Sequence, residues 1–196
     1  TGMDAFVHNL EAYCVNSFHP MADGIAFEGM RMIKEWLPIA MTDASNKEAR
    51  ANLLVASLMG GTAFQKGLGA IHSLSHPVGG IYDAHHGLLN AIFMPYVLQF
   101  NRPVILDKIT RLAQYLQLSD PTFDGFLDWG IKFCQQLGLP TDLKAINIST
   151  ERADDIAERA FLDPSTAGNP RMLSPDSLKQ IFMATVNGNL KSVETI

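Results

Sequence analysis

The chain has 196 residues, of which 47% are hydrophobic and 18% are charged, so it can bury a full core and is not of the disordered class. Its net charge of −5 provides no basic surface for nucleic acid, and no apolar run is long enough for a membrane span. Only two cysteines occur, which is typical of reduced thiols in a cytoplasmic protein and not of a disulfide framework.

The first part of the chain shows the 3.6-residue periodicity of amphipathic helices. The pattern predicts helices over 3–15 and 20–37, and Pro38 is expected to end the second because proline lacks a backbone N–H. A third, strongly apolar helix lies within 42–64. Its paired glycines at 60–61 are costly in a helix interior unless two backbones approach closely there.

Helical periodicity continues through the rest of the chain. A short helix over 70–76 is predicted to stop at Pro77, and a long buried helix over 86–100 is predicted to be kinked at Pro95. The only alternating, strand-like stretch is 145–150, which is short. The sequence therefore predicts an all-α bundle of about eight helices. The remaining helical segments cover 103–116, 121–137, 151–162 and 175–188.

Four of the six histidines fall within fifteen consecutive positions. Asp4 and His8 are four residues apart on a predicted helix, so their side chains share one face and can point at one ion. His72 and His76 have the same spacing, and His86 stands at the start of the next helix. Because neutral imidazole is a common metal ligand, this crowding indicates a metal site.

An aspartate with two or three histidines and no cysteine is a mixed oxygen and nitrogen ligand set. Such a set suits Fe(II), Zn(II), Mn(II) or Ni(II) and contains too much nitrogen for calcium or magnesium. Adjacent residues on a helix diverge by about 100°, so His85 and His86 are not both expected to be ligands. Spacing alone would place His72 and His76 on the same ion, and each pair taken singly also fits an ordinary surface or core role.

Two segments together resemble the signatures of the iron-containing, or group III metal-dependent, alcohol dehydrogenases. TGMDAFVHNLEAY contains D-x3-H, and GLGAIHSLSHPVGGIYDAHHGLLNAIFMPYVLQFN contains H-x3-H-P-x-G followed by H-G. The resemblance extends through ADGIAFEGMRMIKEWLP, EARANLLVASLMGGTAFQKGLG and DPSTAGNPRMLS, and so covers most of the chain.

The resemblance implies roles for individual residues. Asp4, His8, His72 and His86 match the family's ligands for one Fe(II) or Zn(II) ion. His76 matches a histidine that lies beside the metal, where nicotinamide and substrate meet, so it is expected to be catalytic and to contact the cofactor. This assignment differs from the one that spacing alone suggests. No role is implied for the histidine at position 85, where the family often has proline.

The same resemblance implies an enzyme that interconverts a small alcohol with its aldehyde or ketone, using NAD or NADP, and that assembles as a homo-oligomer. The family enzymes look about twice as long as this chain, with an N-terminal α/β domain that binds NAD(P). No G-x-G-x-x-G or G-G-G-S and no βαβ pattern occurs here. We therefore expect residues 1–196 to be the helical C-terminal domain, inactive without the NAD(P)-binding domain.

The sequence is also compatible with three alternative interpretations. One is a glycerol dehydrogenase-like or dehydroquinate synthase-like enzyme on the same scaffold, although D-x3-H combined with H-x13-H argues against that ligand set. Another is a stand-alone metal-binding module without catalysis. The last is a structural helical bundle whose histidines are incidental.

Overall fold

Helices alone build this chain. The computed structural model describes all 196 residues and contains eight α-helices, four short 3-10 helices and no strand, so the predicted all-α class is confirmed. None of the helices combines the length and the hydrophobicity that a bilayer span requires. The α-helices are α1 (Gly2–Cys14), α2 (Pro20–Thr42), α3 (Lys47–Ala63), α4 (Ala70–Tyr82), α5 (His86–Tyr115), α6 (Phe123–Gln136), α7 (Ala153–Leu162) and α8 (Pro175–Asn187).

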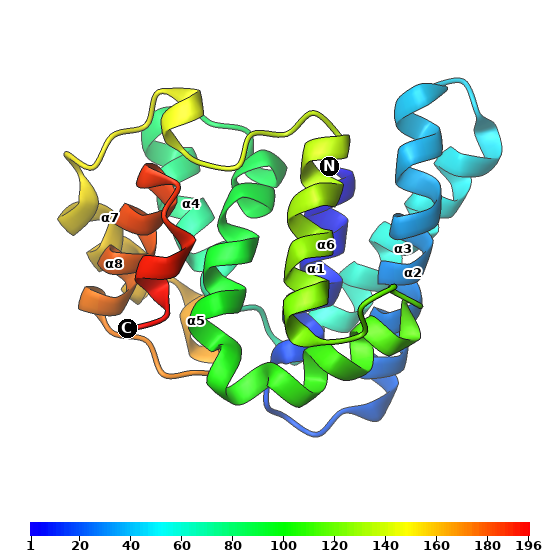
Figure 1. Cartoon of the computed structure of the whole chain (residues 1–196), viewed down its shortest axis with the longest axis horizontal. Coiled ribbons are helices and arrows are strands. Elements are labelled where there is room, and N and C mark those ends of the chain that lie inside the picture. Colours follow the sequence, from blue (N-terminus) through cyan, green and yellow to red (C-terminus); the bar gives the residue numbers. More distant parts are fainter.

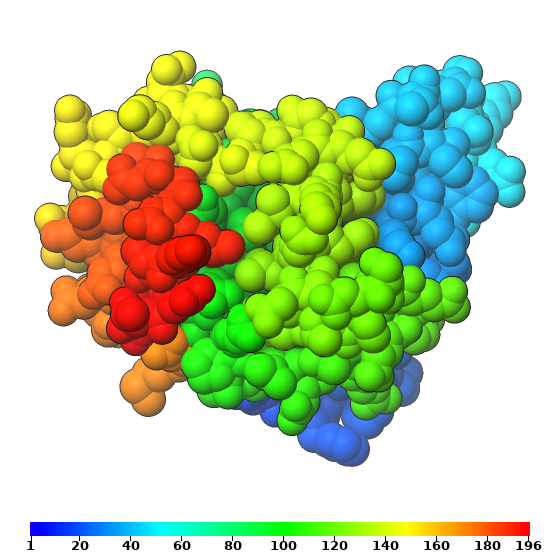
Figure 2. All heavy atoms as spheres, in the orientation of Figure 1, coloured from blue at the N-terminus to red at the C-terminus, as the bar shows by residue number.

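The helices pack around α1 and α5. Helices α2 and α3 form an antiparallel pair against α1, and α7 with α8 lies on the opposite side of α5 (Figure 1). The end of the α2–α3 pair projects from one corner of the molecule (Figure 2). One connected cluster of 52 buried apolar residues draws on all eight α-helices, so the chain has a single core.

Two predicted helix ends are wrong. Helix α2 continues through Pro38 for another four residues, and α4 continues through Pro77 until Asp83 takes a left-handed conformation with φ +52°. A proline inside a helix removes one hydrogen bond and costs about 3 kcal/mol, so packing must compensate. On α4, Leu74 and Val78 stand on either side of Pro77 and are both fully buried, which holds the helix together across it.

The segments 86–100 and 103–116, predicted as two helices, form the single helix α5. Figure 1 shows α5 changing direction along its length, as expected of a helix that contains two prolines. Phe100 and Ile105 lie on either side of Pro103, and each is only 1% exposed. Residues on both sides of Pro103 are therefore buried in the same core, although proline at this position interrupts the local helical pattern.

The strand candidate at 145–150 belongs to a 3-10 turn and the loop after it. Leu143 and Ile148 are buried beneath this loop. The backbone N–H of Leu143 donates to the carbonyl of Thr185 on α8, and the N–H of Ile148 donates to the carbonyl of Leu143. The apolar residues here anchor a loop to α8 and do not form a sheet.

The close backbone approach expected at the paired glycines occurs at Gly60. A Cβ atom on Gly60 would lie 2.8 Å from Nδ2 of Asn9, 3.1 Å from Cβ of His8 and 3.2 Å from the carbonyl oxygen of Ala5. A Cβ atom on Gly61 would meet nothing within 4 Å. Only the first glycine is therefore required for α3 to pack against α1.

We expect Gly60→Ala and Gly61→Ala to change stability in opposite directions. Gly60→Ala should destabilise the fold by about 1–3 kcal/mol because the new methyl group overpacks the α1–α3 contact. Gly61→Ala should stabilise it by up to about 1 kcal/mol because alanine is the better helix former. Urea denaturation of both variants measures the difference, and equal effects would contradict the assignment of the contact to Gly60.

Candidate metal centre

Three helices bring pairs of polar side chains, each pair four residues apart, into one cluster. The four-residue spacing places both members of a pair on the same helix face. The cluster brings together the candidate residues of both sequence signatures, which are far apart along the chain. Its members are Asp4 and His8 from α1, His72 and His76 from α4, and His86 and Asn90 from α5.

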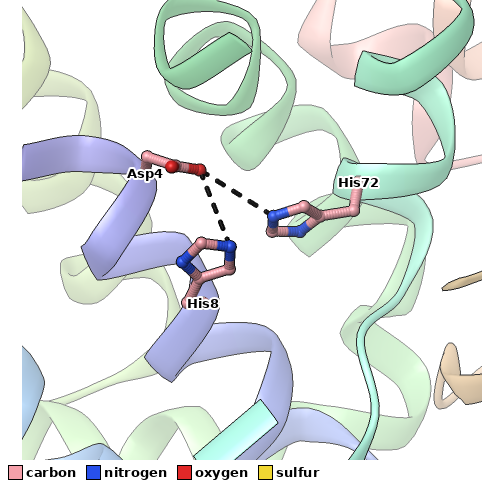
Figure 3. Close-up of side chains that lie close together, drawn as sticks. All are labelled: Asp4, His8 and His72. Carbon is pink, nitrogen blue, oxygen red and sulfur yellow. Dashed lines mark ion pairs between the residues drawn. The ribbon is translucent and has the colours of Figure 1, made fainter. Parts of the chain in front are cut away.

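Asp4 stands at the centre of the candidate ligands. Its Oδ1 lies 3.8 Å from Nε2 of His8 and 3.9 Å from Nε2 of His72, and these side chains point toward one another in Figure 3. The same Oδ1 lies 3.4 Å from Nε2 of His86. Each of the three imidazoles therefore turns Nε2 toward one carboxylate oxygen.

This donor set fits a divalent transition ion. The ligand atoms of Asp4, His8 and His72 all lie within 4.8 Å of one another. Donors bound at ~2.1 Å in a tetrahedral shell are about 3.4 Å apart, close to the observed separations from Asp4. Exposure of the side chain rises from 1% at His72 to 37% at His86, so one side of the cluster is open to solvent.

The surroundings keep two of the imidazoles neutral. Burial lowers the pKa of His8 below its ordinary value of 6.5; the Asp4 carboxylate opposes this shift, and His72 and His86 add to it. Burial is also the main cause that lowers the pKa of His86, with Asp4 again opposing. A neutral imidazole keeps a lone pair for a metal ion, so both shifts favour ligation near neutral pH.

Asn90 was not singled out from the sequence, although it follows His86 by one helical turn. Its side chain is fully buried, and Nδ2 lies 2.7 Å from Oδ1 of Asp4, 3.1 Å from Nε2 of His86 and 3.3 Å from Nε2 of His72. Its Oδ1 is buried without a hydrogen-bond partner. The amide nitrogen of Asn90 thus lies among three candidate ligands, whereas its amide oxygen accepts no hydrogen bond.

His76 lies beside the cluster, and its Nδ1 faces a carboxylate. The distance from Nδ1 to Oδ2 of Asp163 is 2.7 Å, and the ring stacks on His86 with centroids 5.3 Å apart. Burial opposes ionisation of Asp163, but hydrogen bonds from the Ser165 backbone and from His76 outweigh it and lower the pKa of Asp163. The sequence did not reveal this partner, which lies 87 residues away from His76.

His85 caps the beginning of helix α5. It is the N-cap residue of α5, and its Nδ1 accepts a hydrogen bond of 3.3 Å from the backbone N–H of Leu88. The next residue but one, Gly87, allows α5 to begin close to α1, since a Cβ atom there would lie 3.1 Å from Cβ of Asp4. The two residues fix where α5 starts and therefore where His86 stands.

The late DPSTAGNPRMLS motif holds the beginning of α4. Oδ1 of Asn169 accepts a hydrogen bond of 3.2 Å from the backbone N–H of Ala70. Gly168 must lack a side chain, because a Cβ atom would lie 2.1 Å from the carbonyl oxygen of Leu68. On the other side of the same helix end, the carboxylate of Glu11 lies 2.7 Å from Nδ1 of His72. Glu11 was also missed by the sequence analysis.

Comparison with known proteins identifies the family of this chain. Residues 1–186 match the profile described as "Fe-containing alcohol dehydrogenase family, C-terminal". The chain belongs to this family. The resemblance seen in the sequence signatures is confirmed.

The relatives include several dehydrogenases named after their substrates. The chain is 37% identical to a 4-hydroxybutyrate dehydrogenase of Cupriavidus necator, over 93% of this chain and 50% of the relative. It is 33% identical to an NAD-dependent methanol dehydrogenase of Bacillus methanolicus, over 93% and 50%. The crystal structure of a 1,3-propanediol oxidoreductase superposes with a TM-score of 0.90 at 29% identity, over 94% and 50%. The chain thus spans about half the length of the curated relatives it matches.

The lowered histidine pKa values predict a pH dependence of stability. Between the folded-state pKa of His8 or His86 and the ordinary value of 6.5, the unfolded chain binds more protons than the folded chain. The free energy of unfolding of the chelator-treated protein should therefore fall as the pH drops below about 6.5, and His8→Gln should weaken the dependence.

Urea denaturation between about pH 5 and pH 8 measures this effect. The lowered pKa of Asp163 acts in the same direction only below its ordinary value of 3.8, so it does not interfere in this range. Constant stability across the range, in both the wild type and His8→Gln, would contradict the expectation.

Proposed function

We propose that these 196 residues are the metal-binding half of an NAD(P)-dependent alcohol dehydrogenase that interconverts a small alcohol with its aldehyde or ketone. The observation that carries the proposal is the convergence of the Asp4 carboxylate with Nε2 of His8, His72 and His86 in a chain of this family. Relatives described as NADPH-dependent butanol dehydrogenase and NAD-dependent methanol dehydrogenase support the substrate class and cofactor.

Asp4, His8, His72 and His86 would hold one Fe(II) ion, or Zn(II), which the same donor set accommodates. The ion, when bound, supplies Lewis acidity toward the oxygen of the substrate. The buried position of His72 fixes one side of the cluster. The exposure of His86 leaves the other side accessible to a small molecule.

His76 is proposed to relay the hydroxyl proton of the substrate. Its Nδ1 faces Asp163, which leaves Nε2 as the ring nitrogen free to exchange a proton with substrate or solvent. The carboxylate of Asp163 accepts a hydrogen bond from Nδ1 and thereby orients the ring. His76 would thereby act without taking a place among the metal ligands.

The hydride acceptor is proposed to bind mainly outside these residues. A dinucleotide of the Rossmann type rests its pyrophosphate on a Gly-rich turn between a strand and a helix. The half of the relatives that this chain does not match is the candidate location for such a unit. His76, stacked on His86 at the open edge of the cluster, is the residue of this chain proposed to meet the nicotinamide.

Metal titration tests the ligand assignment, with His85→Ala as the control for His86→Ala. His86→Ala should weaken binding of Zn(II) or anaerobic Fe(II) by more than about 100-fold, because even the loss of an outer partner costs 10–100-fold. His85→Ala removes only a helix cap, which is worth about 1 kcal/mol of stability, and should leave affinity nearly unchanged. Calorimetry that finds His85→Ala the more damaging change would overturn the assignment.

A chimaera tests the proposed reaction. It joins these residues to the half of the Cupriavidus necator relative that this chain does not match. With metal and NAD(H) or NADP(H), the chimaera should turn over small alcohols and aldehydes, whereas the 196-residue chain should not. In the chimaera, His76→Ala should lower kcat about 10²- to 10⁴-fold without loss of metal, as expected for a general acid or base.

Two results of these assays would contradict the proposed function. Turnover by the 196-residue chain alone would contradict the division of labour between two halves. A loss of metal in His76→Ala that equals the loss in His72→Ala would place His76 among the ligands. Asp163→Asn removes the charge but keeps the shape, and should reduce kcat less than His76→Ala does.

A further inference from the structure

Glu11 is a buried carboxylate that the proposed reaction does not use directly. It lies on α1 at the spacing that continues the face of Asp4 and His8, and only 6% of its side chain is exposed. Burying a carboxylate is costly unless hydrogen-bond donors surround it. The donors that satisfy Glu11 show what this carboxylate holds in place.

Three donors converge on Glu11, and all belong to the beginning of α4. Oε2 accepts from the backbone N–H of Gly69 at 3.0 Å and faces Nδ1 of His72 at 2.7 Å. Oε1 accepts from the backbone N–H of Ile71 at 2.7 Å. The positive end of the helix dipole favours a carboxylate at this position. Gly69 allows the approach, because a Cβ atom on it would lie 3.0 Å from Oε1.

The surroundings of His72 select one tautomer. A carboxylate only accepts hydrogen bonds, so the short contact with Glu11 requires the proton on Nδ1. On the opposite edge of the ring, Nδ2 of Asn90 lies 3.3 Å from Nε2. An amide nitrogen only donates, so this contact is compatible with a lone pair on Nε2, although Nδ2 lies closer to Asp4 and His86. The Glu11 contact thus selects the tautomer and the Asn90 contact is compatible with it, with the lone pair directed toward Asp4.

Neither of the other two imidazoles has such a partner. The ring of His8 packs against Phe64 with centroids 5.1 Å apart, and no hydrogen bond holds its Nδ1. His86 is partly exposed at the open edge. His72, 1% exposed, is the one candidate ligand whose orientation is fixed by a buried carboxylate.

We propose that Glu11 is a positioning residue that holds His72 in the tautomer with the proton on Nδ1, and that couples this orientation to the beginning of α4. The inference rests on the proposed ligand role of His72. A carboxylate on the outer nitrogen of a ligating imidazole orients the ring and raises its basicity, and its loss typically costs 10–100-fold in metal affinity.

Glu11→Gln tests the proposal with almost no change of shape. Glutamine offers one oxygen and one NH₂ group to three donors, so either Ile71 or the Gly69–His72 pair faces another donor. Long-range ¹H–¹⁵N spectra of the histidine rings in the chelator-treated chain should show His72 protonated on Nδ1 in the wild type. In Glu11→Gln the proton should shift at least partly to Nε2, and Zn(II) affinity should fall about 10- to 100-fold.

Asn169→Ala is the control, because it removes the hydrogen bond to the same end of α4, at Ala70, together with those to Asn101 and Arg171, without touching His72. It should leave the His72 tautomer unchanged and Zn(II) affinity within about threefold of the wild type, since the ligand's own partner is retained. An equal loss of affinity in both variants, with the tautomer unaltered in Glu11→Gln, would reduce Glu11 to a helix cap and overturn the proposal.

The wild-type spectrum decides on its own if Glu11→Gln does not fold, because a proton on Nε2 of His72 would overturn the proposal. Failure of the proposed function gives a different result. If the wild type shows the expected tautomer but binds no ion, the metal role of the cluster is wrong, while the coupling of Glu11 to the His72 tautomer stands.

Discussion

Helix α1 is buried along almost its whole length and yet carries polar side chains on several faces, and the rest of the structure is arranged to satisfy them. Ten of its 13 residues are buried, among them Asn9 and Glu11. Asn9 occupies the space left by Gly29 of α2 and Gly60 of α3, and its Nδ2 donates to the carbonyl of Ala56. Glu11 takes its donors from α4. Polar groups in a core need specific partners, so α1 dictates where its neighbours lie.

The position of α4 follows from this constraint, and the candidate centre follows from the position of α4. Glu11 holds the beginning of the helix from one side, and Asn169 holds it from the other. His72 directly follows Ile71, whose backbone N–H donates to Glu11, and the His72 ring itself contacts the same carboxylate. The ring therefore has little rotational freedom. The cluster therefore depends on segments near both ends of the chain, although each segment alone carries only one or two of its groups.

The helical periodicity was sufficient to predict the all-α class and most helix positions, because it reports which face of a segment is buried. It failed at Pro38, Pro77 and Pro103, where the helix continues although proline is a strong local helix breaker. Burial against other helices outweighs the local cost of these prolines, and the sequence pattern does not contain that burial. The four-residue spacings also revealed the candidate histidines. Asn90 follows His86 by four residues and Glu11 follows His8 by three, but their importance depends on which neighbouring helix faces them, and no local pattern contains that information. Asp163 lies too far along the chain for spacing to connect it with His76.

The cluster has a rigid edge and an open edge, and this division suits the proposed reaction. At the rigid edge His72 is enclosed by Glu11 and Asn90, which leave its ring one favourable orientation. At the open edge His86 and His76 stack in parallel, with 37% and 43% of their side chains exposed. A ligand that fixes geometry gains from burial, whereas a group that exchanges protons must reach substrate or solvent. Asp163 reconciles the two demands on His76, since it orients the ring through Nδ1 while Nε2 stays free for exchange.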